Sequence, residues 1–291
     1  MTSRVIRCAL LVLMALAAPL SAAAQTQIRD LAFEPLRELT DDQKEVFYKV
    51  ANQALCPCNC PLTLAGCLKD KQPKCKRAAI LGRFIARGVQ KGLTTMDILT
   101  ELAEGFSGSQ AGAAVKFSKP PAHTLRGRAG AKLQIVEFAD FRCPHCREAV
   151  HFVEQMLSAL GDKVEFSFRH FPLQNLEPSV LAAEAAEAAG AQGKFVPMYE
   201  LLFKNSDALT RDDLIKYATQ LKLDVKRFTK ELDAHTYRPK VMADKEEATK
   251  AGVQGTPAFF INGREFKLER TLENFKDRAE YDLASDTECA N

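Results

Sequence analysis

FADFRCPHCREA, residues 138–149, places two cysteines in a C-x-x-C motif where the local sequence pattern changes. The residues that lead into it, KLQIVEFADF (132–141), are β-rich and almost uniformly apolar, which is typical of a strand covered on both faces. The residues after it repeat apolar side chains at helical spacing. Cys143 and Cys146 therefore lie at the start of a predicted helix. Three interpretations are open: a metal clamp, a structural disulfide and a redox-active pair.

The first residues of the chain indicate its compartment. MTSRVIRCALLVLMALAAPLSAAAQ begins with Arg4 and Arg7, continues with an apolar run that is short for a membrane span, and reaches small residues at 22–24. This is the layout of a secretory signal peptide, so we expect residues 1–24 to be removed after export. An oxidising compartment permits disulfides, which favours a redox or structural role for the motif. The formal net charge of +3 gives no indication of nucleic-acid binding.

Two parts of different composition flank KPPAHTLRGRAGA, residues 119–131, whose prolines, glycines and scattered charges are typical of a linker and loop. Before it, residues 25–118 combine helical patterns with a cluster of cysteines between 56 and 75. After it, residues 132–285 alternate strand and helix patterns. The sequence therefore predicts a small, mainly α-helical, cysteine-rich domain followed by an α/β domain.

Helices are predicted on either side of the cysteine cluster. One covers 41–55 after the capping residue Thr40, a second covers 76–91, and a short third helix begins at Thr94. The segment between the first two, CPCNCPLTLAGCLKDKQPKC (56–75), is expected to be loop-rich and cross-linked because of its prolines and cysteines.

The second domain has a recognisable order of elements. The strand at 132–141, a helix and a second strand at 164–171, with alternating apolar residues, form a βαβ unit. Residues 178–250 are expected to be helical throughout. AFFING (258–263) predicts a strand that ends in an Asn-Gly hairpin turn, with REFKL as the returning strand and a last helix at 271–284.

This order, with C-x-x-C at the first strand-to-helix junction, resembles the thioredoxin fold with a helical insertion, and in particular the DsbA-like thiol–disulfide oxidoreductases. The residues that carry the resemblance are Glu137, the run Cys143-Pro144-His145-Cys146, and Gly255-Thr256-Pro257 before AFFING. The likeness covers about residues 126–284. It implies an α/β class: a thioredoxin-like fold with a helical insertion at about 178–250, preceded by the helical cysteine-rich domain.

The chemistry of the motif agrees with that resemblance. Unpaired N–H groups and the positive end of the helix dipole stabilise a thiolate at Cys143, and His145 adds a donor or a positive charge. A stabilised thiolate favours the dithiol form and makes the disulfide form oxidising. We therefore expect a resting disulfide, a mixed disulfide between Cys143 and a substrate cysteine, and resolution of that bond by Cys146. The resemblance marks Pro144-His145 as the central pair typical of the oxidase branch.

The resemblance also implies roles outside the motif. In the thioredoxin fold the proline at the position of Pro257 is cis, stacks against the active disulfide and keeps metal off the cysteines, whereas the base rate of X–Pro bonds alone favours trans. Thr256 would offer backbone groups to an extended substrate peptide. Glu137 occupies the position of a buried carboxylate that transfers a proton to or from Cys146. The alternative for Glu137 is a solvated or salt-bridged carboxylate.

The cysteines outside the motif raise a separate question. After removal of the signal peptide they are Cys56, Cys58, Cys60, Cys67, Cys75 and Cys289. Their even number predicts three disulfides, one tying the C-terminal tail to the first domain, in a pairing that the sequence does not define. Two alternatives stay open: a second redox relay built on C-x-C-x-C, and a soft-metal site for Cu(I) or zinc. The segment also faintly resembles CcmH-type thiol modules of cytochrome c maturation, although Cys56-Pro57-Cys58 departs from their C-x-x-C spacing.

Residues 69–91 are strongly basic, with Asp70 as their one acid. A basic face could contact anionic lipid or an acidic partner. A solvated helix face is the simpler interpretation.

The chain is therefore predicted to be an exported, periplasmic thiol–disulfide oxidoreductase that exchanges the Cys143–Cys146 disulfide with cysteines of substrate proteins, with the oxidase direction favoured. A membrane quinone-linked thiol oxidase is the expected redox partner. The alternatives are a disulfide reductase or isomerase serving cytochrome c maturation, and a non-enzymatic metal-binding or chaperone-like protein. No cofactor, nucleic acid or metal is expected; zinc needs four ligands, and His145 and His151 are not expected to converge with the cysteines.

Overall fold

The computed structural model describes residues 27–58, 60–69, 75–106, 114–173 and 177–284. The predicted signal peptide and Cys289 lie outside these ranges. Within them, no helix is both long enough and apolar enough to cross a bilayer.

The N-terminal part of the described chain is helical. Its elements are the 3-10 helix η1 (Glu34–Glu38) and the helices α1 (Asp41–Gln53), α2 (Leu64–Lys69), α3 (Lys76–Gln90) and α4 (Thr95–Phe106). Thr40 caps α1 as predicted, because its side chain accepts a hydrogen bond from the N–H of Gln43. The sequence predicts a loop where α2 forms, since six residues are too few to show helical spacing.

A five-stranded sheet forms the centre of the second part, in the order β1-β3-β2-β4-β5. Its strands are β1 (Leu125–Gly127), β2 (Leu133–Ala139), β3 (Val164–His170), β4 (Ala258–Ile261) and β5 (Arg264–Glu265). The pair β2 and β3 is parallel, and the other pairs are antiparallel. The helix α5 (Pro144–Leu160) connects β2 to β3, which confirms the predicted βαβ unit.

Three details differ from the sequence predictions. The strand β1 lies inside residues 119–131, predicted as linker and loop, because a three-residue strand carries no readable alternation. The returning strand of the hairpin covers only Arg264–Glu265 rather than REFKL. The strand β3 is buried on both faces: Arg169 is 1% exposed because its guanidinium pairs with Asp244, 3.4 Å away, instead of facing water.

The region predicted as a helical insertion consists of helices. They are α6 (Glu177–Gly190), α7 (Phe195–Lys204), α8 (Arg211–Gln220), α9 (Val225–Asp233) and α10 (Arg238–Lys250). One face of the sheet packs against α10, where Phe138 and Phe260 share a cluster with Ala248. The other face meets α5, α7 and the last helix, α11 (Leu272–Leu283), with Phe259 in contact with the rings of Phe152 and Phe275.

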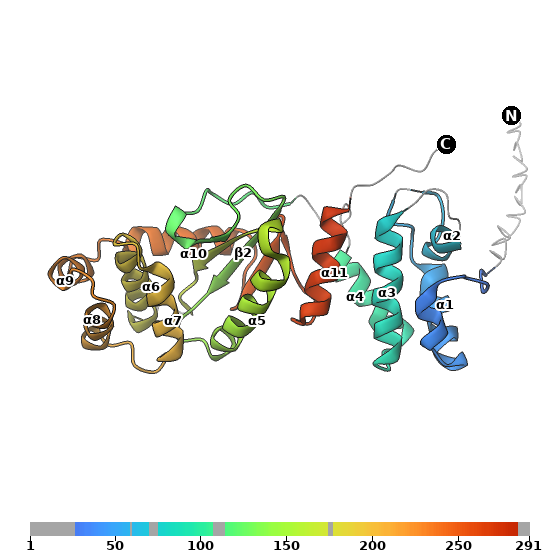
Figure 1. Ribbon diagram of the computed structural model, residues 1–291, viewed down its shortest axis with the longest axis horizontal. Helices are drawn as coiled ribbons and strands as arrows, with labels where there is room; N and C mark the ends of the chain where they lie inside the picture. Colours follow the sequence, from blue (N-terminus) through green and yellow to red (C-terminus); the bar gives the residue numbers. More distant parts are fainter. Residues whose placement is uncertain (1–26, 59, 70–74, 107–113, 174–176, 285–291) are drawn as a thin grey trace, which may run out of the picture.

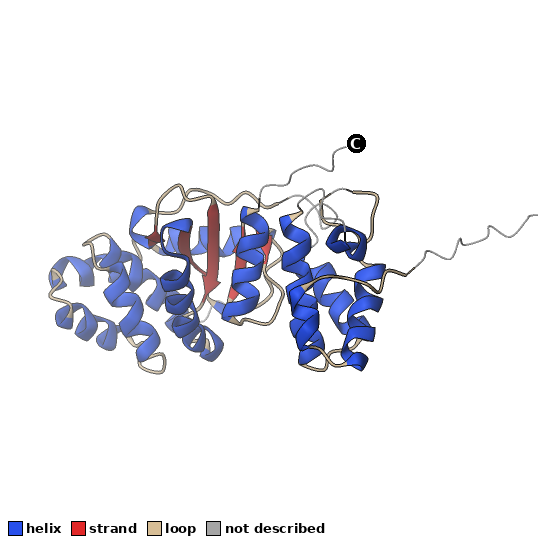
Figure 2. Cartoon of the chain, turned by 45° about the vertical axis from the view of Figure 1, so that its right-hand side comes forward, coloured by secondary structure: helices blue, strands red, loops and turns tan. Residues whose placement is uncertain are grey.

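The helix α11 joins the two parts of the elongated molecule (Figure 1). Figure 2 shows the strands with helices on both sides of them. They lie in the part of the molecule that is away from α1, α2 and α3. On its N-terminal-domain side α11 carries Asp277, which pairs with Arg87, and Glu280, which lies 2.8 Å from Arg83. Part of the basic face predicted for residues 69–91 therefore meets acids of the same chain.

Candidate active site

The C-x-x-C motif lies where β2 passes into α5. The buried carboxylate of Asp140 shapes the turn, since it accepts hydrogen bonds from the N–H groups of Arg142 (2.8 Å) and Leu173 (2.7 Å). Cys143 is the N-cap of α5, and Pro144 follows at the first turn, where its missing N–H costs no helical hydrogen bond. Asp140 was not predicted as a site residue because it lies within the stretch predicted as a strand, which the structure ends at Ala139. An acid near the end of such a stretch, ahead of a turn, is the signal that could have marked it.

The two cysteines of the motif differ in access to solvent. Cys143 is 6% exposed and Cys146 is fully buried. Both are free thiols here, so the structure shows the dithiol form, and the oxidised resting form stays a prediction. Burial raises the pKa of the Cys146 thiol, and the nearby charge of Glu137 adds to that effect. A partner sulfur can therefore approach Cys143, while Cys146 lies beneath it and is held protonated.

The segment predicted to line the substrate groove lies directly beside Cys143. The Thr256–Pro257 peptide bond is cis, as the resemblance implies. The Sγ atom of Cys143 lies 3.4 Å from the carbonyl oxygen of Thr256, which accepts its hydrogen bond. The strand β4, which begins at Ala258, pairs with β2, so the sheet brings these two distant segments of the sequence together.

Glu137 projects from β2 into the protein interior. In the sheet it lies opposite Phe168 and Phe259, on the face that α5 covers. It is fully buried, and neither carboxylate oxygen has a hydrogen-bond partner among the described residues. Burial raises the pKa of Glu137 to about 8, although the positive charges of Arg126 and Arg270 oppose the shift. This contradicts the alternative of a solvated or salt-bridged carboxylate and leaves a group that can hold a proton near neutral pH.

The two histidines close to the motif in sequence point to other partners. His145 has a 70% exposed side chain, and its Nδ1 atom lies 3.5 Å from the carboxylate of Glu148. His151 shares a 3.0 Å hydrogen bond with Gln155, one turn further along α5. His145 is thus available to an approaching molecule at the rim of the site.

Two polar side chains that the sequence analysis missed lie near Glu137. Arg126 on β1 forms a two-pronged ion pair with Glu154 of α5, at 2.5 and 2.7 Å. The hydroxyl of Tyr199, on α7, is buried without a hydrogen-bond partner among the described residues, and burial followed by the charge of Glu137 raises its pKa. Arg126 was missed because it lies in the segment predicted to be a linker.

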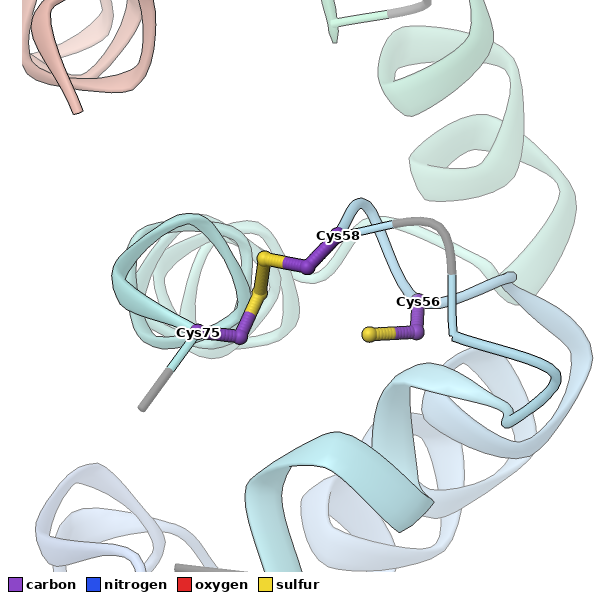
Figure 3. Close-up of side chains that lie close together, drawn as sticks. All are labelled: Cys56, Cys58 and Cys75. Atoms are coloured by element: carbon purple, nitrogen blue, oxygen red, sulfur yellow. A yellow bond between two sulfur atoms is a disulfide. The ribbon is translucent and has the colours of Figure 1, made fainter. Parts of the chain in front are cut away.

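The cysteines of the N-terminal part form disulfides. Cys56 pairs with Cys67. Cys58 pairs with Cys75, and Figure 3 shows this bond beside the Cys56 side chain. Cys60 is also disulfide-bonded. These bonds support the structural interpretation of the cluster; the predicted link to the C-terminal tail lies outside the described residues.

A protein-family model described as thioredoxin matches residues 119–279, which is more than half of the chain and includes the motif and the cis-proline. Among solved structures, oxidised BdbD from Bacillus subtilis shares 25% sequence identity with a TM-score of 0.50, over 59% of this chain and 99% of that one. DsbA2 from Pseudomonas aeruginosa covers the same shares of the two chains at 25% identity, with a TM-score of 0.47.

Curated relatives match about half of the chain. The Na(+)/H(+) antiporter NhaA 3 of Salinispora tropica is 40% identical over 146 residues, which are 50% of this chain and 22% of that protein. The Na(+)/H(+) antiporter NhaA of Herminiimonas arsenicoxydans is 36% identical over 148 residues, 24% of its length. The chain thus spans less than a quarter of these two relatives. The family match and the predicted fold agree: the chain belongs to the thioredoxin family and has the fold of the DsbA-type thiol–disulfide oxidoreductases.

Proposed function

We propose that the chain is an exported oxidoreductase that transfers the Cys143–Cys146 disulfide to cysteines of substrate proteins in the periplasm. One observation carries the proposal: the Sγ atom of Cys143 lies 3.4 Å from the Thr256 carbonyl, while Cys146 is buried beneath. An extended peptide that hydrogen-bonds to the backbone at Thr256 would place its own cysteine beside Cys143. The start of the chain, typical of a signal peptide, supports export.

The exchange runs in two balanced steps. A substrate thiolate attacks the Cys143 sulfur of the oxidised pair; a mixed disulfide forms, the Cys143–Cys146 bond breaks, and Cys146 leaves as a thiolate that takes a proton. A second substrate thiolate then attacks the substrate sulfur of the mixed disulfide, so that the substrate disulfide forms and Cys143 leaves. The substrate loses two electrons and the pair gains them.

Glu137 is the proposed proton donor to Cys146. Because its pKa is raised to about 8, the carboxyl group carries a proton at neutral pH and lies in the interior that receives the new thiolate. Proton transfer inside this apolar region avoids a buried unpaired negative charge on sulfur.

The oxidase direction rests on the position of Cys143 at the N-cap of α5 and on the Pro144-His145 pair. Backbone N–H groups at a helix start stabilise the leaving thiolate, so the dithiol form is favoured and the disulfide is oxidising. Turnover then needs an acceptor for two electrons, and a membrane quinone-linked thiol oxidase is the partner we propose.

Trapping of the mixed disulfide tests the proposal. The mature chain carrying Cys146→Ser, incubated with an oxidised model peptide that contains one disulfide, should accumulate a covalent adduct at Cys143. The matched Cys143→Ser variant should form no adduct there and should lose exchange activity. Wild-type exchange rates in Cys143→Ser would contradict the proposal, because the reactive cysteine would then lie elsewhere.

A further inference from the structure

The disulfides of the N-terminal part lie unusually close to one another. The Sγ atoms of Cys56, Cys58 and Cys75 all lie within 4.8 Å of each other, and those of Cys56, Cys60 and Cys67 form a second such group. Cys56 belongs to both groups. Figure 3 shows the Cys56 sulfur directed toward the Cys58–Cys75 bond.

Local structure produces this convergence. An isolated β-bridge joins Leu55 to Thr63, and the N–H of Cys56 donates to the carbonyl of Leu62 at 3.0 Å, so the C-x-C-x-C segment is folded back on itself. Cys67 lies in α2 and bonds to Cys56 of this loop. Cys75 is the N-cap of α3. The sulfurs are therefore held together by the backbone and not by the disulfides alone.

Access to the cluster is similar to access to the motif. Cys56 is 6% exposed and Cys75 is 8% exposed, whereas Cys143 is 6% exposed. Two apolar side chains stand beside the cluster, Leu55 (70% exposed) and Leu62 (38% exposed), at the ends of the folded loop. Cys56 is therefore as accessible to an external dithiol as Cys143 is.

We propose that Cys56 is the centre of a second thiol–disulfide exchange site, which moves disulfides within the N-terminal part. An external dithiol reduces the Cys56–Cys67 bond and becomes a disulfide itself. The Cys56 thiolate then attacks one sulfur of the Cys58–Cys75 bond; a new bond to Cys56 forms, the old bond breaks, and the other sulfur leaves as a thiolate. The second step conserves the number of disulfides, so the dithiol is the source of both electrons. The proposal does not depend on the function of Cys143.

A matched pair of variants tests it, in the full chain with Cys143→Ser and Cys146→Ser so that the motif contributes no thiol. Cys67→Ser frees Cys56, and Cys56→Ser frees Cys67; each removes the same disulfide and its stabilisation. Cys67 shares neither group of close sulfurs with Cys58 or Cys75 among the described residues. After acid quenching, alkylation and peptide mapping, Cys67→Ser should carry label on Cys58 or Cys75 as well as on Cys56. In Cys56→Ser these two positions should stay unlabelled.

Exchange within one molecule also requires that the distribution of label in Cys67→Ser stay the same after tenfold dilution. If Cys58 and Cys75 stay unlabelled in both variants, Cys56 does not exchange with their disulfide. The proposal is then wrong. Should either variant fail to fold, partial reduction of the parent chain by a sub-stoichiometric dithiol gives a second test. The proposal then requires Cys56–Cys58 or Cys56–Cys75 bonds among the products; native pairs alone would overturn it.

Discussion

The sulfur of Cys143 and the carbonyl oxygen of Thr256 lie 3.4 Å apart although 113 residues separate them in the chain. The contact depends on the antiparallel pairing of β4 with β2, because β2 leads into the motif and the cis Thr256–Pro257 bond leads into β4. The helices of the insertion, α6 to α10, lie between β3 and β4 in the chain. After them, the chain returns to the same edge of the site. One sheet therefore positions both the Cys143 sulfur and the backbone proposed to bind the substrate peptide.

The charge state of Glu137 should make the stability of the protein depend on pH. Its pKa is raised to about 8 in the folded chain, whereas an unfolded Glu titrates near 4.3. The unfolded state therefore releases the proton first, and the wild-type chain loses stability as pH rises between these values. Glu137→Gln lacks this loss. Its unfolding free energy relative to wild type should rise by about 1.4 kcal/mol per pH unit across that window.

Urea unfolding of the two proteins from pH 5 to pH 9 measures this difference. The difference in unfolding free energy between Glu137→Gln and the wild type should stop rising once pH exceeds about 8. A gap that stays constant from pH 5 to pH 9 would show that Glu137 titrates normally and would remove its proposed role as proton donor.

The positive charge of Arg126 should control where Glu137 titrates. Arg126 lowers the Glu137 pKa against the effect of burial, so Arg126→Gln should raise that pKa. The loss of stability would then begin at the same pH, which the unfolded state sets, but continue to a higher pH. Glu154→Gln is the control, because it weakens the same two-pronged ion pair but keeps the guanidinium charge. Urea unfolding from pH 5 to pH 9 measures the effect in both variants. Equal displacement in the two would mean that packing, not charge, produces the effect.

The junction between the two parts should depend on the partly buried ion pair of Asp277 with Arg87. Asp277 has a 9% exposed side chain and pairs with Arg87, whereas the neighbouring Glu280 is 59% exposed and pairs with Arg83. Asp277→Ala leaves a half-buried guanidinium without its partner and should cost about 2 kcal/mol of unfolding free energy. Glu280→Ala should cost less than about 1 kcal/mol. Equal costs in chemical denaturation would show that the pair contributes nothing special to the junction.

The sequence predicts the local features well because short-range chemistry defines them. The cap at Thr40, the position of Cys143 at a helix start and the run of helices after residue 177 all depend on neighbouring residues. The cis bond before Pro257 is different, since residue statistics favour trans and only the family resemblance indicated cis.

What the sequence could not predict depends on distant contacts. The strand β1 is three residues long and exists because β3 offers it an edge, so Arg126 was hidden in an expected linker. The docking of α3 against α11 cannot be predicted from the sequence of either helix alone. It becomes evident only when Arg83 and Arg87 of α3 are seen to pair with Glu280 and Asp277 of α11. The pairing of the N-terminal cysteines likewise depends on α2, a helix too short to be read from its pattern.

The reduction potential of the Cys143–Cys146 pair decides whether this pair donates disulfides or accepts them. The mature chain would be equilibrated in glutathione buffers, and the redox state of the peptide that contains both cysteines would be read by alkylation and mass spectrometry. We expect an oxidising potential, close to the value of about −120 mV known for DsbA. A potential near the value of about −270 mV known for thioredoxin would contradict it and identify the pair as a reductant.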